Sequence, residues 1–101
     1  MINSLTLYPN SIDSEKLEAL LSKHIESMKN AKGLQAIKVS KDSLMSPGRP
    51  SSFAKVLETT WESLEDFMMW VQNQTPEDHA DKNFLIENGA ILLFYEVNDI
   101  T

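Results

Sequence analysis

The sequence contains no cysteine, and it is also poor in glycine and proline, with 3 and 4 of these residues among 101. The absence of cysteine excludes a disulfide scaffold, a thiolate metal site and a thiol nucleophile, and it is compatible with a reducing compartment. The chain begins without the basic start and apolar run of a signal peptide, and no stretch is apolar for long enough to span a membrane. We therefore expect a cytoplasmic protein with no membrane association.

Basic residues are in the minority, because 9 Lys and Arg stand against 15 Asp and Glu, for a formal net charge of -6. The resulting field repels phosphate backbones, so nucleic acid is not an expected partner. A hydrophobic content of 42% with 24% charged residues is ordinary for a folded chain, and the length is typical of one domain. We expect residues 1–101 to form a single domain.

The spacing of apolar residues predicts four strands and two helical regions. Period-two alternation from Ile2 to Tyr8 predicts the first strand, with Asn3, Leu5 and Leu7 on one face. A helical stripe begins near Ser14, and a second begins near Leu64. The other predicted strands are Leu34 to Ser40, Phe53 to Thr60 and Ala90 to Val97.

The second helical region is predicted to come in two pieces. Thr75 is a good N-cap, Pro76 suits the first helical position, and Asp78 completes a capping-box-like pattern. The resulting order, β-α-β-β-α-β, is the ferredoxin-like split βαβ arrangement of the α+β class. It places both helical regions on one face of a four-stranded antiparallel sheet.

The last predicted strand is apolar on both faces, since Ile91 to Tyr95 runs without alternation. A sheet with helices on one face needs another cover for such a strand. A second copy of the chain is the simplest cover, because symmetric self-association is the commonest way to bury a surface. The sequence therefore predicts a homodimer.

Two segments carry a resemblance to a known family. The run Trp61-Glu62-Ser63-Leu64-Glu65-Asp66-Phe67-Met68-Met69-Trp70, followed by Thr75-Pro76-Glu77-Asp78-His79, resembles the antibiotic biosynthesis monooxygenase (ABM) superfamily. The resemblance implies a dimeric α+β barrel. The segment Asp81-Lys82-Asn83-Phe84 also resembles the EthD-like group, whose members share that architecture.

The resemblance implies one of two chemistries. Quinone-forming members oxidise flat polyketide aromatics with oxygen and without metal or flavin, whereas haem-degrading members hold haem as the substrate. The second branch implies catalytic roles for three residues that match its pattern, Asn3, Trp70 and His79. No cofactor is expected in either branch, apart from haem as a candidate substrate.

Further candidate substrate contacts are His24, Trp61 and Phe67. His24 is the one polar residue on the apolar stripe of the first helix, so it either finds an internal partner or faces a pocket. Trp61 and Trp70 have the alternative of packing in the core. The two histidines, His24 and His79, lie on different elements, so no multi-ligand metal site is expected.

Two functions remain open at this stage. The first is a monooxygenase-like enzyme that acts on a flat, apolar aromatic or haem-like substrate without flavin or a protein-bound metal. The second is a non-catalytic dimeric barrel that binds a small apolar aromatic ligand. Whether Asn3, Trp70 and a histidine converge on one cavity decides between them.

Overall fold

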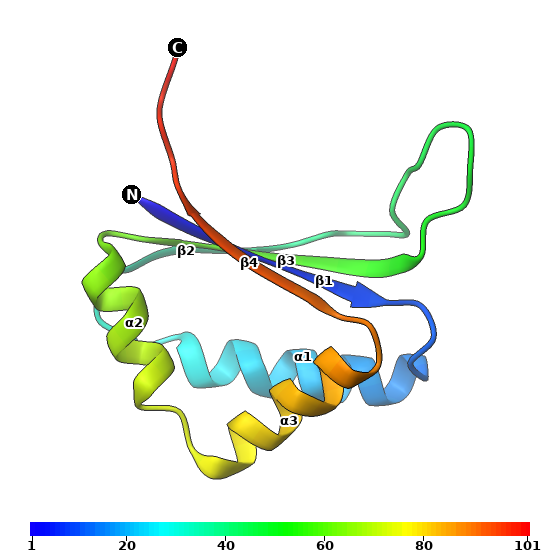
Figure 1. The fold of residues 1–101 in the computed structure, drawn as a ribbon, viewed down its shortest axis with the longest axis horizontal. Helices are drawn as coiled ribbons and strands as arrows, with labels where there is room; N and C mark the ends of the chain where they lie inside the picture. Colours follow the sequence, from blue (N-terminus) through cyan, green and yellow to red (C-terminus); the bar gives the residue numbers. More distant parts are fainter.

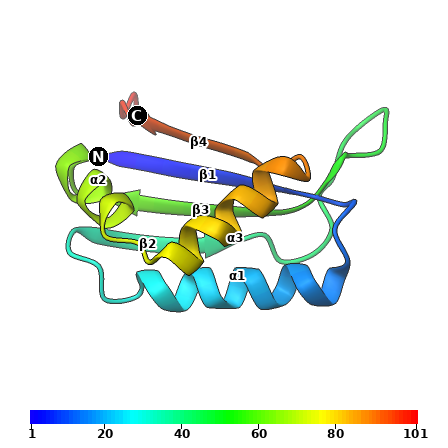
Figure 2. The same cartoon turned by 60° about the horizontal axis from the view of Figure 1, so that its bottom comes forward.

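The computed structural model describes all 101 residues as one sheet with three helices on one of its faces (Figures 1 and 2). The elements are β1 (Ile2–Pro9), α1 (Ser14–Met28), β2 (Leu34–Val39), β3 (Phe53–Trp61), α2 (Leu64–Gln72), α3 (Pro76–Glu87) and β4 (Ile91–Glu96). The predicted α+β fold, with its second helical region in two pieces, is confirmed.

The sheet has the strand order β2-β3-β1-β4, and all neighbouring strands are antiparallel. The central strand β1 pairs with β3 from Ile2 opposite Trp61 onwards, and with β4 from Ile2 opposite Glu96. The first and last strands are therefore neighbours. The two helical regions connect strands that lie on the same sheet, as the split βαβ arrangement requires.

Side-chain caps explain where the two short helices begin. The Ser63 hydroxyl accepts a hydrogen bond from the Asp66 backbone N–H at 3.2 Å and caps α2. At α3, the Thr75 hydroxyl accepts from the Asp78 N–H at 3.1 Å, and the Asp78 carboxylate accepts from the Thr75 N–H at 3.2 Å. This reciprocal pair is the predicted capping box, and it starts α3 independently of α2.

Gly33, in the turn between α1 and β2, lies very close to Asp66 in the first turn of α2. Its φ is +84°, and a Cβ built on it would lie 2.3 Å from the Asp66 Oδ2 atom. Its carbonyl oxygen accepts a hydrogen bond from the Glu62 N–H at 2.8 Å. Only glycine has both the backbone freedom and the space that this turn needs.

The hydrophobic core fills the layer between helices and sheet. Its largest fully buried side chains come from β1, α1 and β3, and they are Trp61, Tyr8, Met28, Leu57 and Thr59. Burial raises the pKa of the Tyr8 hydroxyl, since the phenolate is disfavoured away from water. The core thus holds the sheet firmly against the helices on this side alone.

The two faces of the sheet divide the residues of β1. Ile2, Thr6 and Tyr8 are buried towards the helices, and Ser4 shares their face. The other face, here called the outer face, carries Asn3, Leu5 and Leu7 of β1 together with Ile91, Leu93 and Tyr95 of β4. Every residue of β4 is exposed, and its outer-face side chains are 40%, 50% and 45% exposed in that order. None of the helices has the length and apolarity that crossing a bilayer would require.

Candidate functional site

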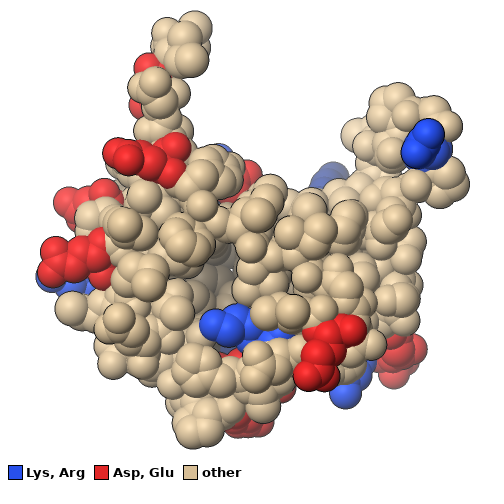
Figure 3. Space-filling model, viewed as in Figure 1, with Lys and Arg blue, Asp and Glu red and all other residues tan.

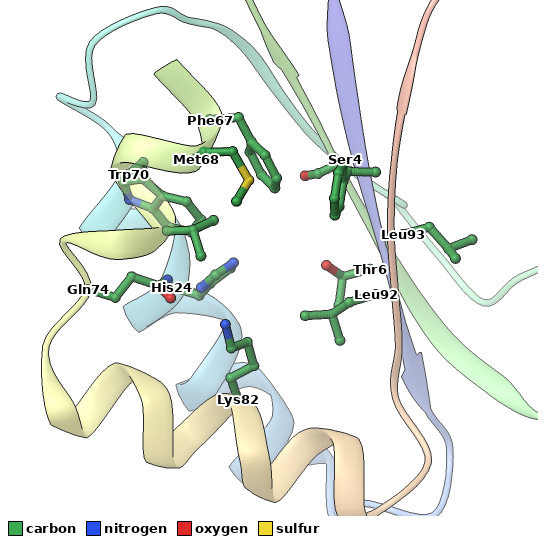
Figure 4. Close-up of a pocket in the computed structure, with 12 residues that line it drawn as sticks. Ser4, Thr6, His24, Phe67, Met68, Trp70, Gln74, Lys82, Leu92 and Leu93 are labelled. Atoms are coloured by element: carbon green, nitrogen blue, oxygen red, sulfur yellow. The ribbon is translucent and has the colours of Figure 1, made fainter. Parts of the chain in front are cut away.

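A cavity of about 200 Å³ opens between the helical layer and the sheet. Figure 3 shows it as a hollow in the surface, and Figure 4 shows the side chains around it. All three helices and two strands contribute to its lining, which consists of Ser4, Thr6, His24, Phe67, Met68, Trp70, Val71, Gln74, Lys82, Leu92, Leu93 and Phe94. Of these, Leu93 directs its side chain away from the cavity, towards the outer face (Figure 4). Elements far apart in sequence therefore build one site.

Aromatic rings form the wall of the cavity on the α2 side. The Trp70 and Trp61 ring centroids are 5.5 Å apart, and the Phe67 ring lies 5.2 Å from that of Phe94 on β4. Trp61 lies behind this wall, fully buried and outside the cavity lining. Such contacts hold the rings rigidly, so the wall is preformed for a flat apolar ligand.

His24 extends from α1 into the cavity beside this wall (Figure 4). Its ring meets Trp70 edge to face, with 5.5 Å between the ring centroids. Burial lowers the pKa of His24 below the ordinary 6.5; the charge of Lys82 acts in the same direction, and that of Asp78 opposes it. His24 is therefore a neutral imidazole at pH 7, with one nitrogen that can accept a proton.

Hydroxyl groups line the sheet side of the cavity, opposite the rings. Ser4 and Thr6 come from β1, and Figure 4 shows both of them facing the helices. The Ser4 hydroxyl is hydrogen-bonded to the Thr59 hydroxyl, which also accepts from the Trp61 Nε1–H at 2.8 Å. This chain of polar groups ties the cavity floor to the buried indole.

Two further polar side chains reach the cavity from the helical layer. Lys82 on α3 directs its ammonium group towards the space in front of His24 (Figure 4), and it is the only Lys, Arg, Asp or Glu in the lining. Gln74 lies in the segment between α2 and α3, and its Oε1 atom is buried without a hydrogen-bond partner. Both groups are available to a ligand.

Three of the candidate residues named from the sequence come together in this cavity, namely Trp70, His24 and Phe67. Asn3 does not join them, because side chains alternate along β1 and those of Ser4 and Thr6 take the helix side. The Asn3 amide instead donates to the Glu58 Oε1 atom at 3.4 Å, and its own Oδ1 atom is buried without a partner.

His79 is also absent from the cavity. It is exposed on α3, one turn before Lys82. Figure 1 shows that α3 begins far from the sheet and approaches it only towards its end. The first turn of α3, which carries His79, is consequently too far from the sheet for His79 to line the cavity. The grouping of Asn3, Trp70 and His79 expected from the family resemblance is therefore not formed in this chain.

Sequence reasoning missed Lys82, Gln74 and the hydroxyls of β1. The sequence places Ser4 and Thr6 on the same face of the first strand, but the alternation does not show which face of the sheet the helices cover. Lys82 had one signal, because it is the only basic residue after Lys55, in the part of the chain that holds most of the acidic residues. No group of three or more His, Cys, Asp or Glu side chains lies close enough to hold a metal ion.

No family model matches the chain, and no curated protein is similar to it in sequence. Several solved structures share its fold over nearly the whole length of both chains. An EthD family protein from Bacillus halodurans is 20% identical, with a TM-score of 0.72 over 97% of this chain and 99% of the other. SnoaB, a cofactor-independent oxygenase from Streptomyces nogalater, is 8% identical, with a TM-score of 0.69 over 97% and 93%.

The same fold also occurs with a different chemistry. A hydroxynitrile lyase from Passiflora edulis is 15% identical, with a TM-score of 0.72 over 99% of this chain and 95% of the other. Two further matches, from Bacteroides fragilis and Thermobifida fusca, are dimeric ferredoxin-like proteins of unknown function, with TM-scores of 0.58 and 0.68 and identities of 17% and 9%. They cover 95% of this chain, and it covers 95% and 90% of theirs. The resemblance is thus confirmed in fold: the chain has the ferredoxin-like architecture shared by a cofactor-independent oxygenase and an EthD family protein.

Proposed function

We propose that the chain is a small, cofactor-independent, monooxygenase-like oxidoreductase that oxidises a flat aromatic substrate in the cavity between helices and sheet. The observation that carries the proposal is the pairing of a ring-lined wall with one neutral histidine, His24, directed into the same space. A substrate held against Trp70 would present an acidic hydrogen to the His24 imidazole. The similar fold of a cofactor-independent oxygenase supports the choice of reaction.

The chain's own groups suffice for the early part of such a reaction. His24 would remove a proton from an activated CH₂ group of a hydroxylated anthrone, and the rings of Trp70 and Phe67 would orient the resulting carbanion and exclude water. The substrate supplies the electrons and dioxygen is the oxidant. One oxygen atom becomes the new carbonyl of the quinone, and the other leaves as water with the two hydrogens of the CH₂ group.

The size of the cavity favours a ligand of a few fused rings over haem. Its volume of about 200 Å³ lies below the ~300–1,000 Å³ usual for pockets that bind drug-sized molecules. His79, the residue that matches the haem ligand of the haem-degrading branch, lies outside the cavity. We therefore propose a small aromatic substrate and no flavin, metal or haem.

Oxygen uptake with 1,8-dihydroxyanthrone tests the proposal. The wild-type chain should consume oxygen faster than buffer alone, and His24→Gln should lower the rate about 100-fold, within the range for loss of a general base. His79→Gln is the matched control, because it removes the other histidine from an exposed position, and it should keep the wild-type rate. A wild-type rate equal to that of buffer, or equal rates in the two variants, would refute the catalytic role of His24.

The rival is a non-catalytic barrel that binds a small aromatic ligand. It is favoured by the position of Asn3, which lies outside the cavity, so the expected convergence of Asn3, Trp70 and a histidine is met only by Trp70 and His24. The fold itself also serves both an oxygenase and a lyase. Saturable binding of the anthrone, followed by quenching of tryptophan fluorescence, without oxygen uptake would establish this rival.

We also propose that the protein is a homodimer whose two outer faces cover each other. On the outer face β1 and β4 together present Leu5, Leu7, Ile91 and Leu93, the β4 residues are exposed, and two proteins of similar fold are dimeric. A symmetric contact would bury the same side chains twice. In this arrangement each subunit keeps its own cavity on the opposite side of the sheet, in a protein that we expect to be cytoplasmic.

A further inference from the structure

The charge of the cavity differs from that of the chain around it. Acidic residues outnumber basic ones by 15 to 9 overall, yet none of the 12 lining residues is acidic and one of them, Lys82, is basic. Lys82 therefore gives the cavity lining a net positive charge. Figure 3 shows a basic side chain at the margin of the hollow, with acidic groups placed farther out.

Lys82 has no carboxylate partner, although several are near it in sequence. Its neighbour Asp81 pairs instead with Lys23 of α1, at 2.8 Å between the Lys23 Nζ and Asp81 Oδ2 atoms. Lys23 also contacts Glu77 at 2.6 Å, and these two hydrogen bonds raise its pKa. The acidic side of α3 is thus occupied by Lys23, while the Lys82 ammonium is left facing the cavity.

An unpaired ammonium at the rim of an apolar cavity is a recognition element for a negative group. It retains water in the empty state, and a ligand carboxylate can replace that water with a charge-assisted hydrogen bond. Gln74, which lines the same cavity, offers a further polar contact through its unpartnered side chain. Figure 4 shows the aromatic wall on the α2 side of His24 and Lys82 on the α3 side.

We propose that Lys82 recognises a carboxylate on the ligand, and that the substrate is a flat aromatic acid whose rings lie against Trp70 and Phe67. This inference rests on the cavity of the proposed function and narrows its substrate class. The carboxylate stays at the rim with Lys82 and does not react. From the carboxylate at Lys82 the ring system extends past His24 towards Trp70 and Phe67, in the order in which Figure 4 shows these side chains.

Two fluorescent probes that differ by one anionic group test the inference. 8-Anilinonaphthalene-1-sulfonate and N-phenyl-1-naphthylamine share the same rings, and only the first carries a negative charge. Dissociation constants for both are measured on the wild-type chain, Lys82→Met, Lys82→Arg and Lys29→Met. Lys29 is exposed at the end of α1 and pairs with Glu26, so its substitution changes the net charge equally but away from the cavity.

We expect Lys82→Met to weaken binding of the sulfonate about tenfold, as the loss of one charge-assisted contact implies, and to change binding of the neutral amine less than about twofold. Lys82→Arg should keep the preference for the anion, and Lys29→Met should leave both constants unchanged. Displacement of the neutral amine should then be stronger with 2-naphthoate than with 2-naphthamide.

Three results would overturn the inference. Equal weakening of both probes in Lys82→Met would mean that Lys82 only packs against the cavity wall. Unchanged dissociation constants for both probes in Lys82→Met, or the same loss of affinity in Lys29→Met, would mean that Lys82 makes no specific contact with the anion. As a control for folding, each variant should show a cooperative thermal unfolding transition. Because binding is measured without turnover, failure of oxygen uptake would leave this inference standing, and its failure would leave the oxygenase proposal untouched.

Discussion

The two faces of the sheet differ in where their hydroxyl groups lie, although the face towards the helices also carries core residues such as Tyr8 and Leu57. The face towards the helices includes the hydroxyls of Ser4, Thr6 and Thr59, whereas the outer face carries leucines such as Leu5 and Leu93. A polar face is ordinarily the one turned to water. Here hydroxyls face the interior because a neighbouring hydroxyl and a buried indole supply their partners. The outer face is the one that we propose to be covered by a second copy of the chain.

The largest expected effect is the loss of dimer association after a substitution on the outer face. Leu93→Lys places a charge at the centre of the proposed contact, and two-fold symmetry places it there twice. We expect association to weaken by about 100-fold or more, because each buried charge without a partner costs several kcal/mol. Light scattering after size exclusion should give the mass of two chains for the wild type and one chain for the variant.

Leu64→Lys is the control for this prediction. Leu64 lies on α2 and is 48% exposed, against 50% for Leu93, but it is not on the outer face. Its substitution should leave the mass unchanged. A wild-type mass of one chain at micromolar concentration would contradict the proposed contact.

The next effect concerns the buried face. Thr59→Val removes the hydroxyl shared by Ser4 and Trp61, and it should lower the free energy of unfolding by about 1–3 kcal/mol, since the indole N–H loses its partner. Thr60→Val is the matched change on the outer face, where Thr60 lies opposite Asn3, and it should cost less than about 0.5 kcal/mol. Urea denaturation at one fixed protein concentration measures both. Equal losses would show that the two faces do not differ in this respect.

A smaller expected effect is the contribution of His24 to the pH dependence of the free energy of unfolding. Because burial lowers the pKa of His24, the unfolded chain binds a proton on this residue more readily below pH 6.5 than the folded chain does. The stability held above pH 6.5 is therefore lost as the pH falls towards the folded pKa, at no more than about 1.4 kcal/mol per pH unit. His24→Gln should lack this loss. As the pH falls from 7.5 to 5.5, the unfolding free energy of His24→Gln should therefore increase relative to that of the wild type. A parallel pair of curves would mean that His24 is not desolvated.

The smallest expected effect separates two adjacent residues of β1. Ser4→Ala alters the cavity floor and should weaken binding of N-phenyl-1-naphthylamine by about two- to fivefold, as the loss of one modest polar contact implies. Asn3→Ala changes the opposite face and should alter that binding less than about twofold. A larger effect for Asn3 than for Ser4 would contradict the placement of these two side chains on opposite faces of the sheet.

Much of the fold could be predicted from local chemistry. The alternation of β1, the Thr75-Pro76 helix start and the unalternating apolar run from Ile91 to Tyr95 each act through neighbours in sequence, and the structure confirms the elements they predict. The ends of the elements shift by a few residues at most. For example, β3 extends to Trp61 and α1 ends at Met28, five residues before the turn at Gly33.

The site could be predicted only where a residue stood out on its own element. His24 stood out as the one polar residue on the apolar stripe of its helix, Trp70 was named through the family resemblance, and both line the cavity. Asn3 matched a family pattern by position in the chain, but its direction depends on which face of β1 the helices cover. The placement of Lys82 depends on the angle at which α3 approaches the sheet, and no local pattern encodes that angle.

The break between α2 and α3 has a consequence for how this protein could acquire new ligands. The aromatic wall belongs to α2, whereas the charged contact belongs to α3, which has its own cap and its own first turn. In the proposed function, contacts to the rings of the ligand and to its charge therefore come from two separate helices. If the chain functions as we propose, a library that varies Lys82 and Gln74 while α2 is kept will change the charge of the ligand that the cavity selects, and it will retain the ring contacts of Trp70 and Phe67.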